Sequence, residues 1–398
     1  MNFLFVCGGT AGHINPAISI ATELRRIMPD AKILFAGADK EMEKRLVPRA
    51  GFHLVNIRMS GLRRDFSPES LIYNMNTVRN LTTAGVKSGE LISRFGPDAV
   101  IGTGGYICYP ILRKAAQMGI PTLVHESNAV PGLTTKLLSA SVDRVLVSFP
   151  GLEELYRRPE RVVFTGTPVR VGFMPPAGDG GFSGDRIKPL VVSFWGSLGA
   201  ERMNEKMTGF IKRNVEAGLF DHIHSAGKNG GVAVMKNRLK QLGVPDTLPF
   251  GIEIREYIDD MQAVMASADI VLCRAGGSTI AEVTAIGKPA VLIPSPYVTN
   301  NQQIENAKQV EKAGGAVLMQ EKDCTGDLLF ETVSALLADR SRLIEMANAQ
   351  KALGAPDAAE RIVELTMELC NPGAGNSGLY SSQGMKGGRE SEQKKTQA

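Results

Sequence analysis

Short apolar runs alternate with helix-length stretches along most of the chain, and this alternation constrains the fold more than any other feature. Each run is only a few residues long and mostly apolar, as is typical of strands buried on both faces of a parallel sheet. Such a sheet needs helices on both sides. The pattern therefore predicts an α/β protein with strands at residues 3–6, 33–36, 54–57, 99–101, 122–124, 144–147, 162–164, 190–194, 252–254, 270–272 and 290–293, and another around Ile223.

The strand–helix pattern pauses near residues 166–170 and then restarts, which indicates two domains. We expect two Rossmann-like parallel-sheet domains, residues 1–167 and 168–354, facing across a cleft. Residues 355–370 are expected to form a last amphipathic helix, and the polar residues 371–398 a disordered tail. Ligands of open α/β sheets bind outside the carboxyl ends of the strands, so this cleft is the predicted active site.

Composition argues against several classes of function. The net charge of +4 is too small to indicate nucleic-acid binding. The five cysteines are scattered without a C-x-x-C, which indicates neither a zinc site nor a disulfide framework and fits a reducing compartment. Without a D-x-D or a His/Asp cluster of ligand spacing, we expect no metal and no cofactor. No apolar run approaches the ~20 residues of a spanning helix, so the chain should be soluble or attached to one membrane face.

The stretch from Ile270 to Asn306 carries the strongest binding signal. The glycine pair 276–277 follows a buried strand and precedes a helix, where free N–H groups and the helix dipole favour a phosphate. Glu282 lies one turn further on, where a carboxylate can accept hydrogen bonds from a ribose diol. The amides of Gln302 and Gln303 suit sugar hydroxyls.

Each of these features also has a simpler explanation. Thr279 and Glu282 have the spacing of a capping box, which needs no ligand, and Gln302 and Gln303 could begin a solvated helix. Their occurrence together in one strand–helix–strand unit favours a nucleotide-sugar site.

Two glycine-rich loops in the first half also follow strands. Residues 7–13 keep the backbone features of an anion cradle, although they do not match the G-x-G-x-x-G fingerprint of dinucleotide binding. His13 lies where this cradle meets a helix, which is expected from Asn15-Pro16 onward. It could act as a base, or it could merely cap the turn. Residues 102–106 form the second cradle, which close helix–strand packing explains equally well.

Polar residues at two further strand ends complete the candidates. His125, Glu126 and Asn128 follow a buried strand, where chemistry usually lies in this fold, although Glu126 could instead brace neighbouring backbone amides. Ser197 follows another strand in a third glycine loop, where its hydroxyl could meet a phosphate. Trp195 beside it is expected to pack in the core.

An apolar stripe rimmed by basic residues lies between the first two glycine loops. Leu71, Met75 and Val78 recur at helical spacing, with Arg and Lys side chains around them. Such a stripe can lie on an anionic bilayer surface, although composition alone favours a core role.

Eight segments together resemble the MurG family of UDP-N-acetylglucosamine–N-acetylmuramyl-(pentapeptide) pyrophosphoryl-undecaprenol N-acetylglucosaminyltransferases. They occur in the family's order and cover the chain to about residue 370: GGTAGHINPA, IGTGGY, HESNAVPGLT, TGTPVR, WGSLGA, YIDDM, RAGGSTIAEVTAIGKPAVLIP and NNQQIENA. The resemblance implies a GT-B fold with an acceptor- and membrane-binding first domain and a second domain that binds UDP-N-acetylglucosamine (UDP-GlcNAc).

The resemblance also implies an activity and its partners. The expected reaction is an inverting transfer of GlcNAc from UDP-GlcNAc to the muramyl 4-hydroxyl of lipid I, giving lipid II for peptidoglycan synthesis. The expected location is the cytoplasmic side of the cell membrane, peripherally attached to an anionic surface. Other cell-wall synthesis proteins are expected partners, and nucleic acid is not. The resemblance raises the membrane interpretation of the Leu71–Val78 stripe above the core interpretation.

Motif positions assign the site residues that the resemblance implies. His13 is the favoured base, with His125 and Glu126 in support. The acceptor is expected to contact Gly9, Gly104, Gly105, Tyr106 and Asn306. The donor is expected to contact Thr10, Gly12, Asn128, Arg170, Ser197, Ile258, Ser278, Thr279, Glu282, Gln302 and Gln303.

The chain departs from the family pattern at a few positions, and rival activities remain to be separated. Ala11 stands where glycine is usual, Thr135 where Asn is common, and Trp195 and Leu198 where Gly and Gln are more common. None of these positions is a proposed base or donor contact. The rivals are a diacylglycerol glycosyltransferase, a UDP-GlcNAc 2-epimerase, an NAD-dependent oxidoreductase and a non-catalytic scaffold.

Overall fold

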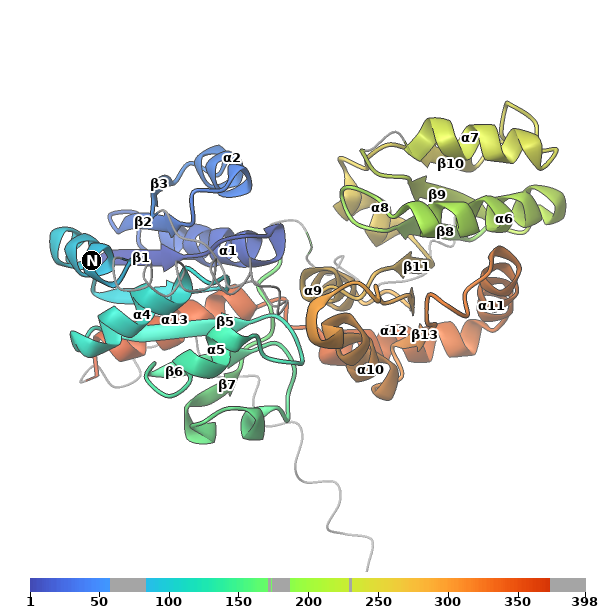
Figure 1. Cartoon of the computed structure of the whole chain (residues 1–398). Coiled ribbons are helices and arrows are strands. Elements are labelled where there is room, and N and C mark those ends of the chain that lie inside the picture. Colours follow the sequence, from blue (N-terminus) through green and yellow to red (C-terminus); the bar gives the residue numbers. More distant parts are fainter. Residues whose placement is uncertain (58–83, 171–172, 174–186, 229–230, 373–398) are drawn as a thin grey trace, which may run out of the picture.

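Seven parallel strands form the sheet of the first lobe. The computed structural model describes residues 1–57, 84–170, 173, 187–228 and 231–372, and Figure 1 shows two lobes side by side. The sheet order is β3-β2-β1-β4-β5-β6-β7, so the chain adds strands outward from β1 in both directions. The strands are β1 (Asn2–Val6), β2 (Lys32–Gly37), β3 (His53–Asn56), β4 (Ala99–Gly102), β5 (Thr122–Glu126), β6 (Arg144–Val147) and β7 (Val162–Phe164).

Alternating side chains of β1 supply two separate cores in this lobe. Phe3 and Phe5 point to the face covered by α1 (Ala11–Ile27) and α2 (Glu41–Arg49). Leu4 and Val6 point to the face covered by α4 (Cys108–Gln117) and α5 (Leu133–Leu138). Burial on both faces explains why these strands are continuous apolar runs in the sequence. Two short 3₁₀ helices, Glu153–Leu155 and Pro159–Arg161, precede β7.

The second lobe repeats this plan with six parallel strands in the order β10-β9-β8-β11-β12-β13. Helices α6, α7 and α11 lie on one face and α8, α9 and α10 on the other. The strands are β8 (Leu190–Phe194), β9 (Asp221–Ser225), β10 (Ile252–Arg255), β11 (Ile270–Cys273), β12 (Ala290–Leu292) and β13 (Ala316–Leu318). The helices are α6 (Glu201–Ala217), α7 (Gly231–Gln241), α8 (Met261–Ser267), α9 (Gly277–Ile286), the 3₁₀ turn Thr299–Asn301, α10 (Gln302–Lys312), α11 (Gly326–Ala338) and α12 (Arg340–Leu353).

A buried polar network lies inside the second lobe. Ser193 Oγ on β8 lies 2.8 Å from Nε2 of His222 and 2.7 Å from Nδ1 of His224, both on β9. His224 Nε2 lies 3.3 Å from Oδ1 of Asn204 on α6. All four residues are buried, so the two imidazoles are held neutral in a core that water does not reach.

The last helix returns to the first lobe. Helix α13 (Ala358–Cys370) packs on α1, and its Ile362 and Val363 join the core that contains Phe3 and Phe5. In Figure 1 it crosses behind the teal strands of the first lobe. The two connections between the lobes touch each other, because a Cβ added at Gly166 would lie 2.2 Å from Cβ of Ala355.

Every predicted strand is present, and two details differ from the sequence-based expectation. Strand β13 was missed, because its three residues follow a Gly-Gly pair with no longer apolar run to mark them. Helix α1 begins at Ala11 and contains Pro16, whereas Pro16 was expected to mark its start. The predicted apolar stripe at residues 71–78, and nearly all of the predicted tail, lie outside the described residues. Within the described ranges, no helix has the length and apolar character needed to cross a membrane.

Candidate active site

Helices from the two lobes meet end to end at the interface. Helix α1 starts after Thr10, and α9 starts after Gly276, at the side of the second lobe that faces the first in Figure 1. The Oγ atom of Ser278 lies 3.5 Å from the carbonyl oxygen of Gly12. The structure therefore brings together Thr10, Gly12 and Ser278, which the sequence predicted as donor contacts.

Neither helix start is capped by a side chain. Thr10 and Gly276 are the N-cap residues; the Thr10 side chain accepts no capping hydrogen bond, and Gly276 has no side chain that could. The capping-box explanation for Thr279 and Glu282 therefore does not apply. Among the described residues, the N–H groups of Gly12, Ser278 and Thr279 have no acceptor. Free N–H groups at the positive ends of helices favour phosphate groups in general, so these two helix starts are consistent with the predicted diphosphate site.

Asn306 on α10 ties the lobes together. Its side chain is fully buried; Oδ1 accepts from the Ala129 N–H at 2.7 Å, and Nδ2 donates to Asn128 Oδ1 at 3.0 Å and to the Ala275 carbonyl at 3.1 Å. The prediction that Asn306 contacts the acceptor needs correction, because each polar atom of its amide is already bonded to protein. A Cβ added at Gly277 would lie 2.3 Å from the Ser127 carbonyl oxygen, so the lobes are in close contact here.

Glu126 organises the loop that carries Asn128. Its Oε1 accepts from the N–H of Asn128 at 3.2 Å and from Asn128 Nδ2 at 3.0 Å. Its Oε2 accepts from the Gly132 N–H at 2.9 Å and from Thr135 Oγ1 at 2.8 Å. The bracing alternative therefore accounts for this carboxylate, and we no longer assign Glu126 to the chemistry. Sequence reasoning left Thr135 unassigned, and its hydroxyl takes part in this bracing.

Arg170 and Glu282 form an ion pair at the junction of the lobes. Nε and Nη2 of Arg170 lie 3.0 and 2.9 Å from Oε1 of Glu282. Burial raises the pKa of Glu282, and the Arg170 guanidinium partly offsets that rise. Both residues were predicted to bind the donor, and the structure places them side by side at the middle of α9. Sequence alone indicated neither this contact nor that two guanidinium nitrogens of Arg170 share one carboxylate oxygen of Glu282.

His13 presents one ring nitrogen and has the other fixed. Nδ1 lies 2.9 Å from the carbonyl oxygen of Gly8, which can only accept, so Nδ1 carries the proton. No partner of Nε2 occurs in the part of the chain described here, and the residue is half-buried. The ring lies against Gly104, where an added Cβ would be 2.4 Å from its Cδ2. Nε2 is therefore free to accept a proton from a substrate.

His125 is less suited to proton transfer than the sequence suggested. It is 1% exposed, and its Nε2 lies 2.9 Å from the carbonyl oxygen of Gly166. Burial lowers the pKa of His125 to about 4. Its ring is thus a neutral donor to one of the connections between the lobes. We correct its role from catalysis to holding that connection.

The sequence missed Glu43, which lies at the first glycine loop. Its Oε1 accepts from the Gly9 N–H at 2.7 Å, and its Oε2 accepts from the Lys40 N–H at 2.7 Å. The Gly9 N–H is therefore already bonded, and the predicted contact of Gly9 with the acceptor, which stays a prediction, would have to use another atom of this residue. Glu43 lies three residues after Lys40, which is the spacing of a helix cap, and this spacing is the only sequence signal that could have drawn attention to Glu43.

The second glycine loop lies directly against the first. An added Cβ at Gly105 would be 2.5 Å from the Gly8 carbonyl oxygen, and Gly104 and Gly105 both have positive φ angles of 119° and 91°. Close packing of the two loops therefore accounts for glycine at these two positions. The N–H groups of Gly104 and Gly105 still have no acceptor among the described residues, and Tyr106 follows them, packed against the first-lobe core.

The remaining predicted donor residues follow strands of the second lobe. Ser197 is exposed after β8, and Ile258 follows β10 with its side chain buried. Gln302 Nε2 donates to the Val130 carbonyl at 3.3 Å, which is another contact between the lobes. Gln303 Oε1 accepts from the Ser295 N–H at 2.8 Å. All four lie beyond the carboxyl ends of strands, where this fold binds ligands.

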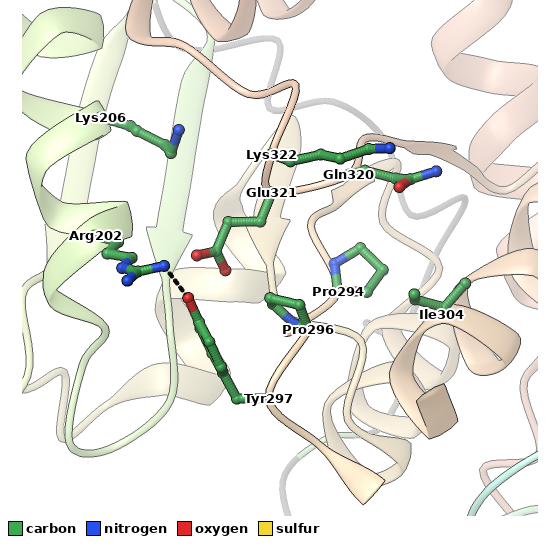
Figure 2. Close-up of a pocket in the computed structure, with 9 residues that line it drawn as sticks. All are labelled: Arg202, Lys206, Pro294, Pro296, Tyr297, Ile304, Gln320, Glu321 and Lys322. Atoms are coloured by element: carbon green, nitrogen blue, oxygen red, sulfur yellow. Dashed lines mark hydrogen bonds between the residues drawn. The ribbon is translucent and has the colours of Figure 1, made fainter. Parts of the chain in front are cut away.

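A separate cavity of about 250 Å³ lies between α6 and the loops after β12 and β13. Figure 2 shows Arg202 and Tyr297 joined by a hydrogen bond at its edge. Beneath it, Arg274 Nη1 lies 2.6 Å from Glu321 Oε2 in a buried ion pair. No predicted site residue lines this cavity, so we do not place the reaction in it. Its lining is Arg202, Lys206, Pro294, Pro296, Tyr297, Ile304, Gln320, Glu321 and Lys322.

Two further kinds of side chain could carry chemistry, namely clusters of metal-ligand type and cysteine thiols. No group of three or more His, Cys, Asp or Glu side chains in the described part of the chain could hold an ion. Four of the five cysteines are buried, and burial raises the pKa of the thiols of Cys7, Cys108 and Cys273. These thiols are therefore core side chains and not nucleophiles.

Two Rossmann-like lobes with opposed helix starts at their interface define the GT-B fold, and the family matches identify the chain as a glycosyltransferase. Residues 3–147 match the glycosyltransferase family 28 N-terminal domain, and residues 190–362 match the family 28 C-terminal domain. The chain belongs to the family of UDP-N-acetylglucosamine--N-acetylmuramyl-(pentapeptide) pyrophosphoryl-undecaprenol N-acetylglucosamine transferases, at 37–41% identity to eight of its members.

Individual relatives cover nearly the whole chain. The transferase of this name from Acetivibrio thermocellus is 41% identical over 372 residues, which are 93% of this chain and 98% of the relative. That from Caldanaerobacter subterraneus is 40% identical over 93% of this chain and 100% of the relative. The crystal structure of Acinetobacter baumannii MurG superposes with a TM-score of 0.72 at 25% identity, covering 92% of this chain and 100% of that one.

Proposed function

We propose that this chain transfers GlcNAc from UDP-GlcNAc to the muramyl 4-hydroxyl of lipid I, giving lipid II, with inversion at the anomeric carbon. One observation carries the assignment of the site: the starts of α1 and α9 meet at Gly12 and Ser278, and the free nitrogen of His13 lies one residue away. The family supports the two substrates, because its members are named for them.

The donor is proposed to lie along the second lobe with its diphosphate at the start of α9. The N–H groups of Ser278 and Thr279 would meet the phosphates, together with Ser197. Glu282 would accept hydrogen bonds from the ribose hydroxyls, which compete with its contact to Arg170. The sugar would reach Gln302 and Gln303, and the uracil the backbone of Ile258.

The chemistry is proposed to be a single displacement. The acceptor hydroxyl attacks the anomeric carbon from the face opposite UDP, and Nε2 of His13 takes its proton. The negative charge that grows on the UDP oxygen is stabilised by helix-terminal N–H groups already in place. One displacement inverts the anomeric centre, by the logic that separates inverting from retaining glycosidases. Asn128 and Asn306 support this arrangement by holding the lobes together.

A donor-turnover assay tests the activity directly. UDP release from UDP-GlcNAc is expected to require a lipid I analogue, and diacylglycerol should not replace that analogue. A diacylglycerol glycosyltransferase would give the reverse preference. A UDP-GlcNAc 2-epimerase would convert the donor with no acceptor present, and finding that conversion would refute the transferase assignment.

We also propose that the first lobe works at the cytoplasmic surface of the cell membrane. A groove of about 900 Å³ between residues 85–93 and α4 is lined by the exposed apolar side chains of Val86 and Met118 and by the cations Arg113 and Lys114, and the exposed Lys87 follows Val86 in the chain. An apolar patch rimmed by cations suits an anionic bilayer, where each lysine contributes about 1 kcal/mol. The predicted stripe at residues 71–78 precedes this groove in the sequence.

Vesicle binding tests the membrane proposal. We expect the double variant Lys87→Glu/Lys114→Glu to bind phosphatidylglycerol vesicles at least about tenfold more weakly than the native chain. Lys236→Glu/Lys240→Glu on α7 of the second lobe makes the same change in net charge and should bind normally. Equal losses in the two double variants would show attraction by net charge alone and would contradict a membrane face at this groove.

A further inference from the structure

One peptide group lies between a buried carboxylate and the ring of His13. Its N–H belongs to Gly9 and donates to Glu43 Oε1 at 2.7 Å. Its carbonyl belongs to Gly8 and accepts from His13 Nδ1 at 2.9 Å. Glu43, the Gly8–Gly9 peptide group and His13 therefore form a continuous hydrogen-bonded chain from α2 to α1.

The space around the Glu43 carboxylate leaves no room for a side chain at position 8. The side chain is fully buried, and an added Cβ at Gly8 would lie 2.6 Å from its Oε1. Gly9 has a φ of 90°, a conformation that side chains disfavour. Only glycines at positions 8 and 9 thus let the carboxylate approach this peptide group.

No cation neutralises Glu43 in the described residues. The nearest lysine in sequence, Lys44, pairs with Asp39 at 3.0 Å and with Glu41 at 3.5 Å. The other oxygen of Glu43 accepts from the Lys40 N–H at 2.7 Å. The negative charge is therefore directed at backbone N–H groups, one of which belongs to the peptide group that holds His13.

We propose that Glu43 is a positioning residue that supports His13 as a base through the Gly8–Gly9 peptide group. A carboxylate that accepts from the N–H end polarises the peptide and makes the carbonyl end a stronger acceptor. That carbonyl holds the proton on Nδ1, keeps the lone pair of Nε2 available and stabilises the imidazolium that forms after proton transfer. The inference deepens the proposed function, on which the kinetic part of its test depends.

The other titratable groups around this chain of bonds come from three further elements. Cys7 follows β1, Cys108 begins α4, and His125 and Glu126 end β5. Burial raises the pKa of both thiols and lowers the pKa of His125 to about 4, so none of these three changes charge near neutral pH. Glu126 is held by four hydrogen bonds within its own loop.

The test compares Glu43→Gln with Glu41→Gln, which removes the same charge from an exposed position in the same helix turn. Two-dimensional NMR of histidine-labelled full-length protein reports the tautomer and titration midpoint of His13, and the exposed His53 serves as internal reference. In Glu43→Gln we expect the His13 midpoint to move to lower pH and its Nδ1–H tautomer to lose population. We expect kcat to fall about tenfold and the acid limb of its pH profile to move to lower pH, while KM for UDP-GlcNAc stays unchanged. Glu41→Gln should match the native chain.

Each alternative gives a different result. An unchanged His13 midpoint and tautomer in Glu43→Gln would overturn the inference, whatever happens to activity. A shifted midpoint with native kcat would leave the link between Glu43 and His13 intact and would show instead that His13 is not the base. If Glu43→Gln fails to fold, Glu43→Asp carries the test, because it keeps the charge but is too short to reach both N–H groups. A native-like His13 tautomer and midpoint in Glu43→Asp would then overturn the inference.

Discussion

His13→Ala is expected to lower kcat by about 10²- to 10⁴-fold, the range that a positioned general base contributes. The free Nε2 of this histidine lies beside the meeting point of α1 and α9, so its removal takes away the proton acceptor. The Gly8 carbonyl would lose a hydrogen bond, but the loop would keep the Gly9–Glu43 contact. We therefore expect the affinity for UDP-GlcNAc, measured by calorimetry, to stay within about threefold of the native value.

Glu282→Ala provides the reciprocal control. Its carboxylate lies on α9 and has no contact with the first glycine loop, so its loss should weaken donor binding and leave the base in place. Hydrogen bonds to a charged group contribute about 1.5–3 kcal/mol, which corresponds to roughly 10- to 150-fold in the dissociation constant. Steady-state kinetics at saturating donor separate the two variants. If His13→Ala loses donor affinity as much as turnover, His13 is a binding residue and another group is the base.

Acid is expected to destabilise the fold below about pH 6.5 through three buried histidines. Burial lowers the pKa of His125 to about 4 and of His224 to about 3, and it lowers the pKa of His222 well below its ordinary value. In the unfolded chain each imidazole takes up a proton near pH 6.5. Because the unfolded state binds more protons in this window, stability is complete above about pH 6.5 and is lost as pH falls toward the folded-state values.

Between about pH 7.5 and pH 5 the free energy of unfolding is expected to fall by about 2 kcal/mol for each of His125 and His224. His222 acts in the same direction. Denaturant unfolding at the two pH values measures it. In His224→Gln the difference between the two pH values should shrink by about 2 kcal/mol, whatever the variant costs at pH 7.5. His53→Gln, at an exposed position, should keep the native difference. An unchanged pH difference in His224→Gln would contradict the linkage.

The strands were predictable from sequence because each is buried on both faces and so appears as an unbroken apolar run. The helix starts at which the phosphates are proposed to bind were predictable because glycines and helices follow those strands directly. Contacts between distant segments were not. Glu43 bonds to a residue 34 positions away, and Asn306 to one 177 positions away, and neither residue type nor spacing marks such a pair. Asn306 stood in a segment of amides suited to sugars, which made a ligand role the natural expectation.

The return of α13 to the first lobe has a consequence for how the protein is made. A ribosome that has released residues 1–167 has produced all seven strands of the first sheet, but not the helix whose Ile362 and Val363 cover the phenylalanines of β1. The first lobe can be completed only when almost the entire polypeptide has emerged. During synthesis the part of the first-lobe core that α13 covers therefore stays exposed while the second lobe is made. The two lobes reach their final state together.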